Sequence, residues 1–108
     1  MKKIVLYVLI TFASFGSLAG NVKGTVRDLY IHSTSDKVMF NINATSYNFT
    51  NCATSSRYAF KVGSPQGQAM LSALLFAKAA GKSINIHGGN SCDIHGDSED
   101  IAYLWVNE

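Results

Sequence analysis

Alternating apolar and polar residues predict five β-strands in this chain. Alternation with a period of two places side chains of one kind on one face of a strand. The segments that alternate, or that are rich in β-forming residues, are residues 22–33, 37–44, 57–62, 82–87 and 101–106. In the first segment the alternation changes phase near Asp28, which indicates a β-bulge or a strong bend.

The second of these segments has the most regular alternation and predicts a half-buried strand. One face carries Val38, Phe40, Ile42 and Ala44. The opposite face carries Met39, Asn41 and Asn43. A strand of this kind normally packs on the core with its apolar face and leaves the other face to solvent.

A helix is predicted at residues 65–80, between the third and fourth strands. Ser64 suits the N-cap, Pro65 the first helical position, and Gly81 the position just past a helix end. Three strands, a helix and two strands are the order of the five-stranded OB barrel, in which a bend at Asp28 would let the first strand serve both halves. The predicted fold is therefore mainly β with one helix, a five-stranded OB-fold barrel. A small sandwich with one helix, or an α+β sheet, is the alternative.

The predicted helix is apolar nearly all the way round. One stripe, expected to cap the barrel, consists of Met70, Ala73, Leu74 and Ala77, with Leu71 at its edge. The opposite side consists of Gln68, Ser72, Leu75, Phe76 and Ala79. Lys78 is the only charged residue of the helix, so this side lacks the charges of an ordinary solvated face. It is therefore a predicted interface for self-association or a partner chain, unless the N-terminal residues or the loop at residues 45–56 cover it.

The N-terminus has the pattern of a secretory signal peptide. Lys2 and Lys3 supply its positive start, and an uncharged apolar run follows. Cleavage after Ala19 would remove residues 1–19 and leave a single domain at residues 20–108, and cleavage one residue later is the alternative. The run is shorter than the ~20 residues that cross a bilayer, so no membrane span is expected after cleavage. The predicted location is secreted or periplasmic.

The charge balance excludes one class of partner. The whole chain has nine Lys and Arg residues against seven Asp and Glu residues. Removal of Lys2 and Lys3 with the signal peptide leaves basic and acidic residues in equal number. A protein that binds a nucleic-acid backbone needs a cationic face, and no cluster of Lys or Arg remains to form one. Nucleic acid is therefore not an expected partner.

The chain contains two cysteines, Cys52 and Cys92. An even number of cysteines in an exported protein indicates a disulfide, so we expect these two to be bonded to each other. The alternative is a cysteine nucleophile assisted by His87 or His95. A second cysteine in an oxidising compartment disfavours a reactive thiolate.

The acidic segment at residues 93–100 has side chains that could hold a cation, but its spacing is wrong for calcium. An EF-hand loop has Gly at its sixth position and Glu at its twelfth, where this chain has Ser98 and Leu104. We therefore expect a solvated turn in which Asp97 and Glu99 bond backbone amides. No metal site is predicted.

Two aromatic residues, Tyr47 and Phe49, lie in the polar loop that follows the second strand. Exposed aromatic rings can stack on the apolar face of a sugar, so these two are candidate ligand-binding residues. The alternative is that they pack over the barrel mouth or the helix.

Motifs between Gly67 and Leu104 resemble those of a known family. They are Gly-x-x-Met-Leu-x-x-Leu-Leu-x-Ala-Lys-Ala-x-Gly-Lys, then Ile-x-Ile-x-Gly, a Cys, and Gly-Asp-x-Glu-x-Ile-x-Tyr-Leu. These motifs are similar to those of small exported bacterial proteins related to the binding subunit of subtilase cytotoxin, which in turn resemble the pentameric OB-fold binding subunits of AB5 toxins. The resemblance implies a disulfide-bonded OB fold, a helix that packs against neighbouring subunits, and glycan binding. It assigns no sugar-contacting residue, and toxicity would require a separate A subunit.

Taken together, the sequence predicts an exported, non-enzymatic binding module without a cofactor. No Ser-His-Asp signature, paired-carboxylate motif, zinc-ligand spacing or phosphate-binding glycine loop stands out. The predicted ligand is a glycan or a protein, and the predicted assembly is a homo-oligomer formed through the helix. The alternative is a standalone periplasmic protein that binds or inhibits another protein through its barrel face. A small hydrolase or metal binder is the third hypothesis.

Overall fold

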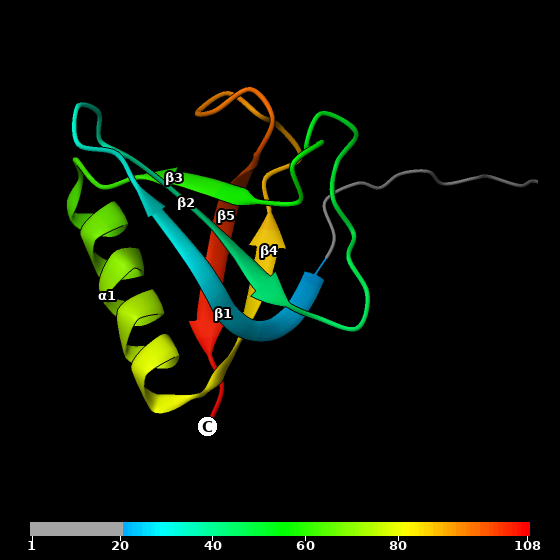
Figure 1. Cartoon of the computed structure of the whole chain (residues 1–108), viewed down its shortest axis with the longest axis vertical. Helices are drawn as coiled ribbons and strands as arrows, with labels where there is room; N and C mark the ends of the chain where they lie inside the picture. The colour runs from blue at the N-terminus through cyan, green and yellow to red at the C-terminus, as the bar shows by residue number, and fades with distance from the viewer. Residues whose placement is uncertain (1–20) are drawn as a thin grey trace, which may run out of the picture.

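Five strands and one helix form in the predicted order (Figure 1). The structure is a computed structural model, and it describes residues 21–108. The predicted signal peptide at residues 1–19 lies outside the described residues. The elements are β1 (Asn21–Ile31), β2 (Lys37–Asn43), β3 (Tyr58–Lys61), α1 (Pro65–Ala80), β4 (Ser83–Gly88) and β5 (Glu99–Val106).

The strands form a closed barrel in the spatial order β1-β2-β3-β5-β4. β1 pairs antiparallel with both β2 and β4, and β4 pairs antiparallel with β5. The barrel closes through a short parallel pairing of β3 with β5, which joins Tyr58 to Glu99 and Ala59 to Asp100. The predicted fold class, a five-stranded OB-fold barrel with the helix between β3 and β4, is confirmed.

β1 bends at the position where its alternation changes phase. Its register with β2 shifts between Val26 and Leu29, as expected of a bulge near Asp28. Residues 21–25 of β1 pair with β4, whereas residues 25–31 pair with β2. The bent strand therefore belongs to both halves of the barrel (Figure 1).

Apolar side chains from four of the strands and from the helix form the core. The fully buried members are Val22, Val26, Val38, Phe40, Ile42, Tyr58, Phe60, Leu74, Ala77, Ile84 and Ile86. They include Val38, Phe40 and Ile42 of the predicted apolar face of β2 and both predicted inward residues of β4, whereas Ala44 lies beyond the end of β2 and is only partly buried. Removal of this apolar surface from water is the main favourable contribution to folding.

β2 differs from the half-buried strand that its alternation predicted. On its opposite face, Met39 and Asn41 are only 2% and 7% exposed, and Asn43 alone is exposed. The strand is therefore buried on both faces. Alternation identifies the side chains that face the core, but it cannot show that other segments of the fold also cover the outer face.

The helix α1 begins and ends at the predicted residues. The Ser64 hydroxyl accepts a hydrogen bond of 3.1 Å from the backbone N–H of Gly67, and Pro65 begins the first turn. Gly81 adopts the left-handed conformation, with φ of 68°, and its N–H bonds carbonyls of the last turn. Both helix ends are thus defined by local side-chain and backbone chemistry.

A disulfide joins the β2–β3 loop to the β4–β5 loop. It links Cys52 to Cys92, which confirms the predicted pairing. The carboxylate of Glu99 joins the same loops, because it accepts hydrogen bonds from the N–H groups of Thr50 (2.9 Å) and Asn90 (3.0 Å). Glu99 is fully buried, so the expected solvated turn is wrong at this residue, although its expected bonding to backbone amides is confirmed. A buried carboxylate needs such donors to offset its lost hydration.

Candidate functional site

The outer face of β1, β4 and β5 carries rows of polar and aromatic side chains. One row consists of Asn21, His87 and Tyr103, and the next of Lys23, Asn85 and Trp105. The third row consists of Thr25, Ser83 and Asn107. We refer to these residues together as the β1-β4-β5 face. The residues that alternate with them, including Val22, Ile84 and Ile86, point into the barrel.

Three rings of the β1-β4-β5 face stack on one another. The ring centroids of His87 and Tyr103 are 4.9 Å apart, and those of Tyr103 and Trp105 are 6.0 Å apart, with interplanar angles of 9° and 21°. Tyr103 and Trp105 remain 52% and 45% exposed. Nδ1 of His87 lies 2.7 Å from the side-chain oxygen of Asn21, which holds the ring in place. The result is an ordered, exposed aromatic strip.

Side-chain amides border this aromatic strip. Nδ2 of Asn107 donates hydrogen bonds to Oδ1 of Asn85 (2.7 Å) and to the hydroxyl of Ser83 (3.1 Å). The backbone N–H of Asn107 also donates to the Ser83 carbonyl, at 2.9 Å. These bonds restrict the side chains, so their polar groups would be held in position before a ligand arrives.

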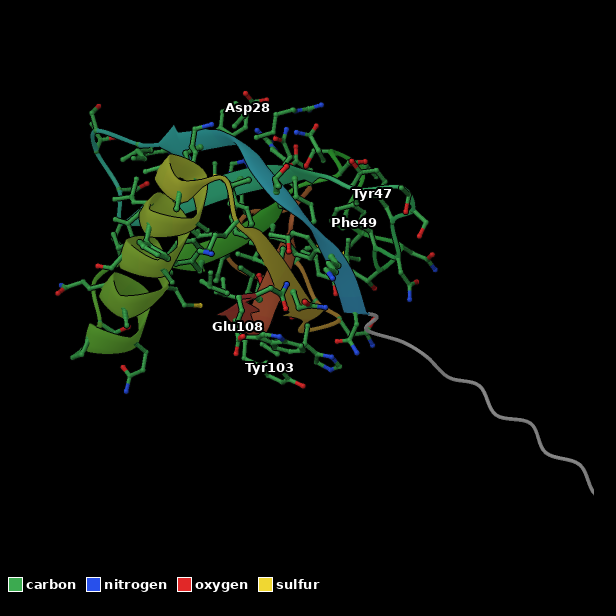
Figure 2. All side chains as sticks on the ribbon, turned by 90° about the horizontal axis from the view of Figure 1, so that it is seen from below. Asp28, Tyr47, Phe49, Tyr103 and Glu108 are labelled. Atoms are coloured by element: carbon green, nitrogen blue, oxygen red, sulfur yellow. A yellow bond between two sulfur atoms is a disulfide. The ribbon has the colours of Figure 1, made fainter. Side chains whose placement is uncertain are left out.

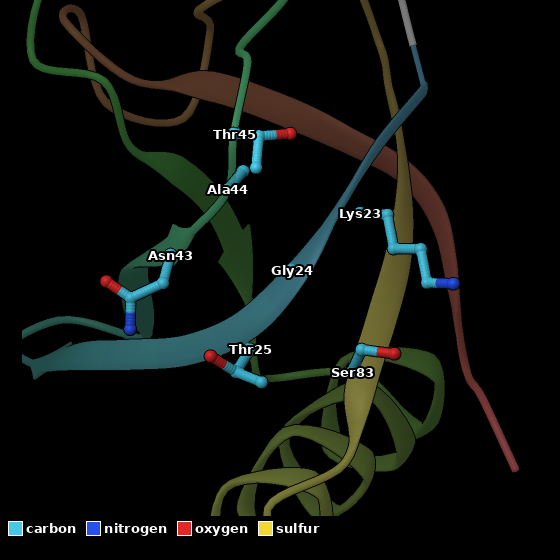
Figure 3. Close-up of a pocket in the computed structure, with 7 residues that line it drawn as sticks. All are labelled: Lys23, Gly24, Thr25, Asn43, Ala44, Thr45 and Ser83. Carbon is cyan, nitrogen blue, oxygen red and sulfur yellow. The ribbon is translucent and has the colours of Figure 1, made fainter.

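A shallow pocket of about 470 Å³ adjoins the face beside residues 23–25 of β1 (Figure 3). It is lined by Lys23, Gly24, Thr25, Asn43, Ala44, Thr45 and Ser83. Three of these residues also belong to the β1-β4-β5 face, and the others include the end of β2. Five of the seven lining residues carry polar side chains, so the pocket offers hydrogen-bonding groups to a polar ligand.

A separate charged cluster lies between β1 and the segment that precedes β5. Arg57 lies over the ring of Tyr30, 5.0 Å from its centroid, and its Nη2 is 3.2 Å from the Asp97 carboxylate. The hydrogen bond from Ser98, and then the neighbouring Arg57, hold the pKa of Asp97 below its ordinary value of 3.8. Nε2 of His95 lies 3.6 Å from the same carboxylate. The carboxylate of Asp97 thus bonds side chains, not the backbone amides that the sequence suggested.

The predicted ligand-binding residues, Tyr47 and Phe49, lie on a different part of the barrel from Tyr103 (Figure 2). Phe49 packs on the buried ring of Tyr58, with centroids 4.8 Å apart, and Tyr47 stacks on Phe49 at 5.7 Å. The hydroxyl of Tyr47 donates a hydrogen bond of 2.7 Å to the Ile42 carbonyl. Phe49 is therefore part of the core packing, and Tyr47 keeps one exposed ring face.

The helix α1 has the two faces that its sequence predicted. Leu74 and Ala77 are buried, and Met70 and Leu71 pack against the core. All five residues of the predicted interface, Gln68, Ser72, Leu75, Phe76 and Ala79, are exposed. Leu75 and Phe76 are 49% and 56% exposed, so neither the β2–β3 loop nor any other part of residues 21–108 covers them.

The aromatic strip is not among the sites predicted from the sequence, although the sequence contains a signal for it. Tyr103 and Trp105 are two residues apart and flank Leu104, so they had to share the face opposite to the core. His87 occupies the equivalent outward position on β4. What the sequence did not contain was the register that sets His87 beside Tyr103.

The chain matches no known family model, no curated protein and no solved structure. Within residues 21–108, no group of three or more His, Cys, Asp or Glu side chains is gathered closely enough to hold a metal ion. In the same part of the chain, no helix has the length and apolar character needed to cross a membrane.

Proposed function

We propose that this chain is an exported, non-enzymatic glycan-binding module that resembles the binding subunits of AB5 toxins and self-associates through its helix. The observation that carries the proposal is the exposed strip formed by His87, Tyr103 and Trp105. The C–H groups on one side of a sugar ring form an apolar surface that stacks favourably on an aromatic π face. Tyr103 and Trp105 are each about half exposed, so the ring surface that is not covered by a neighbouring ring is available to a sugar.

The groups beside the strip support the same ligand. A sugar that stacks on the strip still needs hydrogen-bond partners for its hydroxyl groups, because an unpaired polar group is costly to desolvate. The amides of Asn85 and Asn107, the hydroxyl of Ser83 and the ammonium group of Lys23 lie in the adjoining rows.

Self-association is supported by the exposed apolar side of α1. Leu75 and Phe76 lie on the far side of the helix from the core, and each is about half exposed. Full burial of an exposed Leu or Phe side chain contributes roughly 1.5–3 kcal/mol. Because each of these two is already about half buried, an interface between copies would gain about half of that from each. An interface between copies that is formed by the outer side of α1 would leave the β1-β4-β5 face free to bind a ligand.

A glycan array with the secreted protein, followed by titration of each array hit, tests the binding function. Trp105 is the only tryptophan in the chain, so its fluorescence reports directly on the aromatic strip. We expect a change in this fluorescence on binding, and a loss of affinity of at least tenfold, about 1.4 kcal/mol, in Tyr103→Ala. Tyr47→Ala is the matched control, because it removes an exposed tyrosine elsewhere on the barrel.

Two results would reject this assignment. The first result is that the wild-type protein binds no glycan on the array but binds a protein ligand, and that Tyr103→Ala lowers its affinity for that ligand. This would favour the alternative, in which the barrel face binds a protein. Glycan binding that is lost in Tyr47→Ala and retained in Tyr103→Ala would move the site to the β2–β3 loop.

A further inference from the structure

We propose that the β1-β4-β5 face binds the interior of an extended β-1,4-linked oligosaccharide, with the pocket beside residues 23–25 of β1 as a second subsite. This inference rests on the proposed glycan-binding function and adds the shape of the ligand. It follows from three observations: the strip and the pocket share one face, together they are longer than one sugar, and neither encloses a chain end.

The strip and the pocket are connected by one row of the sheet. Trp105 lies opposite Asn85, and Asn85 lies opposite Lys23, which lines the pocket. Thr25 and Ser83 extend the pocket wall in the next row. A ligand can therefore pass from the aromatic strip across β4 to the pocket without leaving the surface.

The length of this path exceeds what one sugar ring would cover. It runs from β5 across β4 and β1 to the end of β2, which is three strand spacings, or roughly 14 Å. A single ring stacked on Tyr103 or Trp105 would leave the pocket empty. Both subsites are filled together only by a chain of several sugars.

The exposure of the rings argues for the interior of a chain. Sites for a single small ligand usually enclose most of its surface. Here Tyr103 and Trp105 are about half exposed, and the pocket is shallow and open (Figure 3). A β-1,4-linked chain forms a flat ribbon with ring C–H groups on its faces and hydroxyl groups on its edges. Such a ribbon can lay ring C–H groups on the exposed surface of Tyr103 and Trp105 while its edge hydroxyls reach the neighbouring amide and hydroxyl side chains.

Isothermal titration with defined oligomers tests this inference. The probes are cello-oligosaccharides and β-1,4-linked N-acetylglucosamine oligomers of one to six sugars. In at least one series we expect affinity to rise at least tenfold between the disaccharide and the tetrasaccharide or longer chains. A methyl glycoside of the same sugar should bind far more weakly than the tetrasaccharide.

Two variants separate the subsites. Thr45→Met would extend a side chain over the pocket and should lower the affinity for long oligomers toward that for the disaccharide, while disaccharide binding stays unchanged. Tyr103→Ala should weaken the binding of both. Thr34→Met, on an exposed residue of another loop, is the control for the added side chain.

The inference is overturned if neither series binds, or if affinity is independent of chain length. It is also overturned if Thr45→Met leaves long-chain affinity unchanged. If array glycans bind by a terminal sugar while both series fail, the inference is wrong but the proposed function stands. If no glycan of any kind binds, the proposed function itself is wrong.

Discussion

The backbone N–H of Asp28 donates a hydrogen bond of 2.9 Å to the side-chain oxygen of Asn41 on the adjacent strand. Asp28 lies in the bulge of β1, where the ladder between β1 and β2 is interrupted. An amide left outside the ladder needs another acceptor, and the side chain of Asn41 provides it. The bulge thus depends on a residue 13 positions away in sequence.

Asn41→Ala should therefore destabilise the protein, because it removes this acceptor from a mostly buried site. We expect the free energy of unfolding to fall by about 1–3 kcal/mol. Asn43→Ala, on an exposed residue of the same strand face, should change it by less than about 0.5 kcal/mol. Urea denaturation monitored by circular dichroism measures both, and equal losses in the two variants would contradict the role of Asn41.

Gly88 is required by the buried carboxylate of Glu99. A Cβ at Gly88 would collide with the carboxylate oxygens, whereas a Cβ at Gly96 would meet open space. Gly88→Ala should lower the free energy of unfolding by roughly 1–3 kcal/mol through overpacking. Gly96→Ala should leave it nearly unchanged. Thermal unfolding compares the two variants, and a Gly88→Ala protein as stable as wild type would show that Glu99 can move aside.

The disulfide between Cys52 and Cys92 spans 40 residues of sequence. The chain-entropy estimate for closing such a loop is about 4 kcal/mol. The double variant with both cysteines changed to Ser should therefore unfold at much lower urea concentration than wild type. Peptide mapping without reductant should find the two cysteines in one linked fragment of the purified protein. Two free thiols there would contradict the pairing.

The two faces of α1 should respond differently to charge. Leu75→Glu combined with Phe76→Glu should give a folded monomer, because both residues are exposed and charge opposes association. Leu74→Glu should unfold the domain, because Leu74 is fully buried and a buried unpaired carboxylate is costly. Sedimentation for mass and circular dichroism for folding are the measurements. A wild-type monomer, or a double variant that unfolds like Leu74→Glu, would refute self-association through the helix.

The depressed pKa of Asp97 predicts a small acid-sensitive contribution to stability. The Ser98 hydroxyl and Arg57 favour the charged carboxylate in the folded protein. Because the folded pKa lies below the ordinary value of 3.8, this contribution is present above pH 3.8 and is lost as the pH falls through the folded value. The carboxylate is nearly half exposed, so solvent screening keeps the contribution small.

The measurement for Asp97 is urea denaturation of Asp97→Asn between pH 7 and pH 2. The variant should be slightly less stable than wild type at neutral pH, and the difference should vanish at the acidic end. Asp93→Asn is the control, because Asp93 is exposed and its side chain makes no ion pair within residues 21–108. A difference for Asp97→Asn that does not depend on pH would contradict the prediction.

The sequence by itself determined the features that depend on neighbouring residues. Ser64, Pro65 and Gly81 defined the helix because caps act within one turn. The phase change at Asp28 located the bulge because side-chain direction follows the local strand period. The predicted pairing of Cys52 with Cys92 needed only their number and an oxidising compartment.

Only the tertiary structure decided which distant segments meet. Closure of the barrel pairs Tyr58 with Glu99. As a result, β5 begins two residues earlier than the alternation in the sequence indicated. The same closure buries the side chain of Glu99, which was expected in solvent. The same closure aligns His87 with Tyr103 and Asn85 with Trp105, and so creates the aromatic face. Strand register is set by packing and hydrogen bonding across the whole sheet, and a one-residue shift would turn these side chains to the opposite face. A local pattern specifies the faces of one strand, but it does not specify the neighbouring strand or its register.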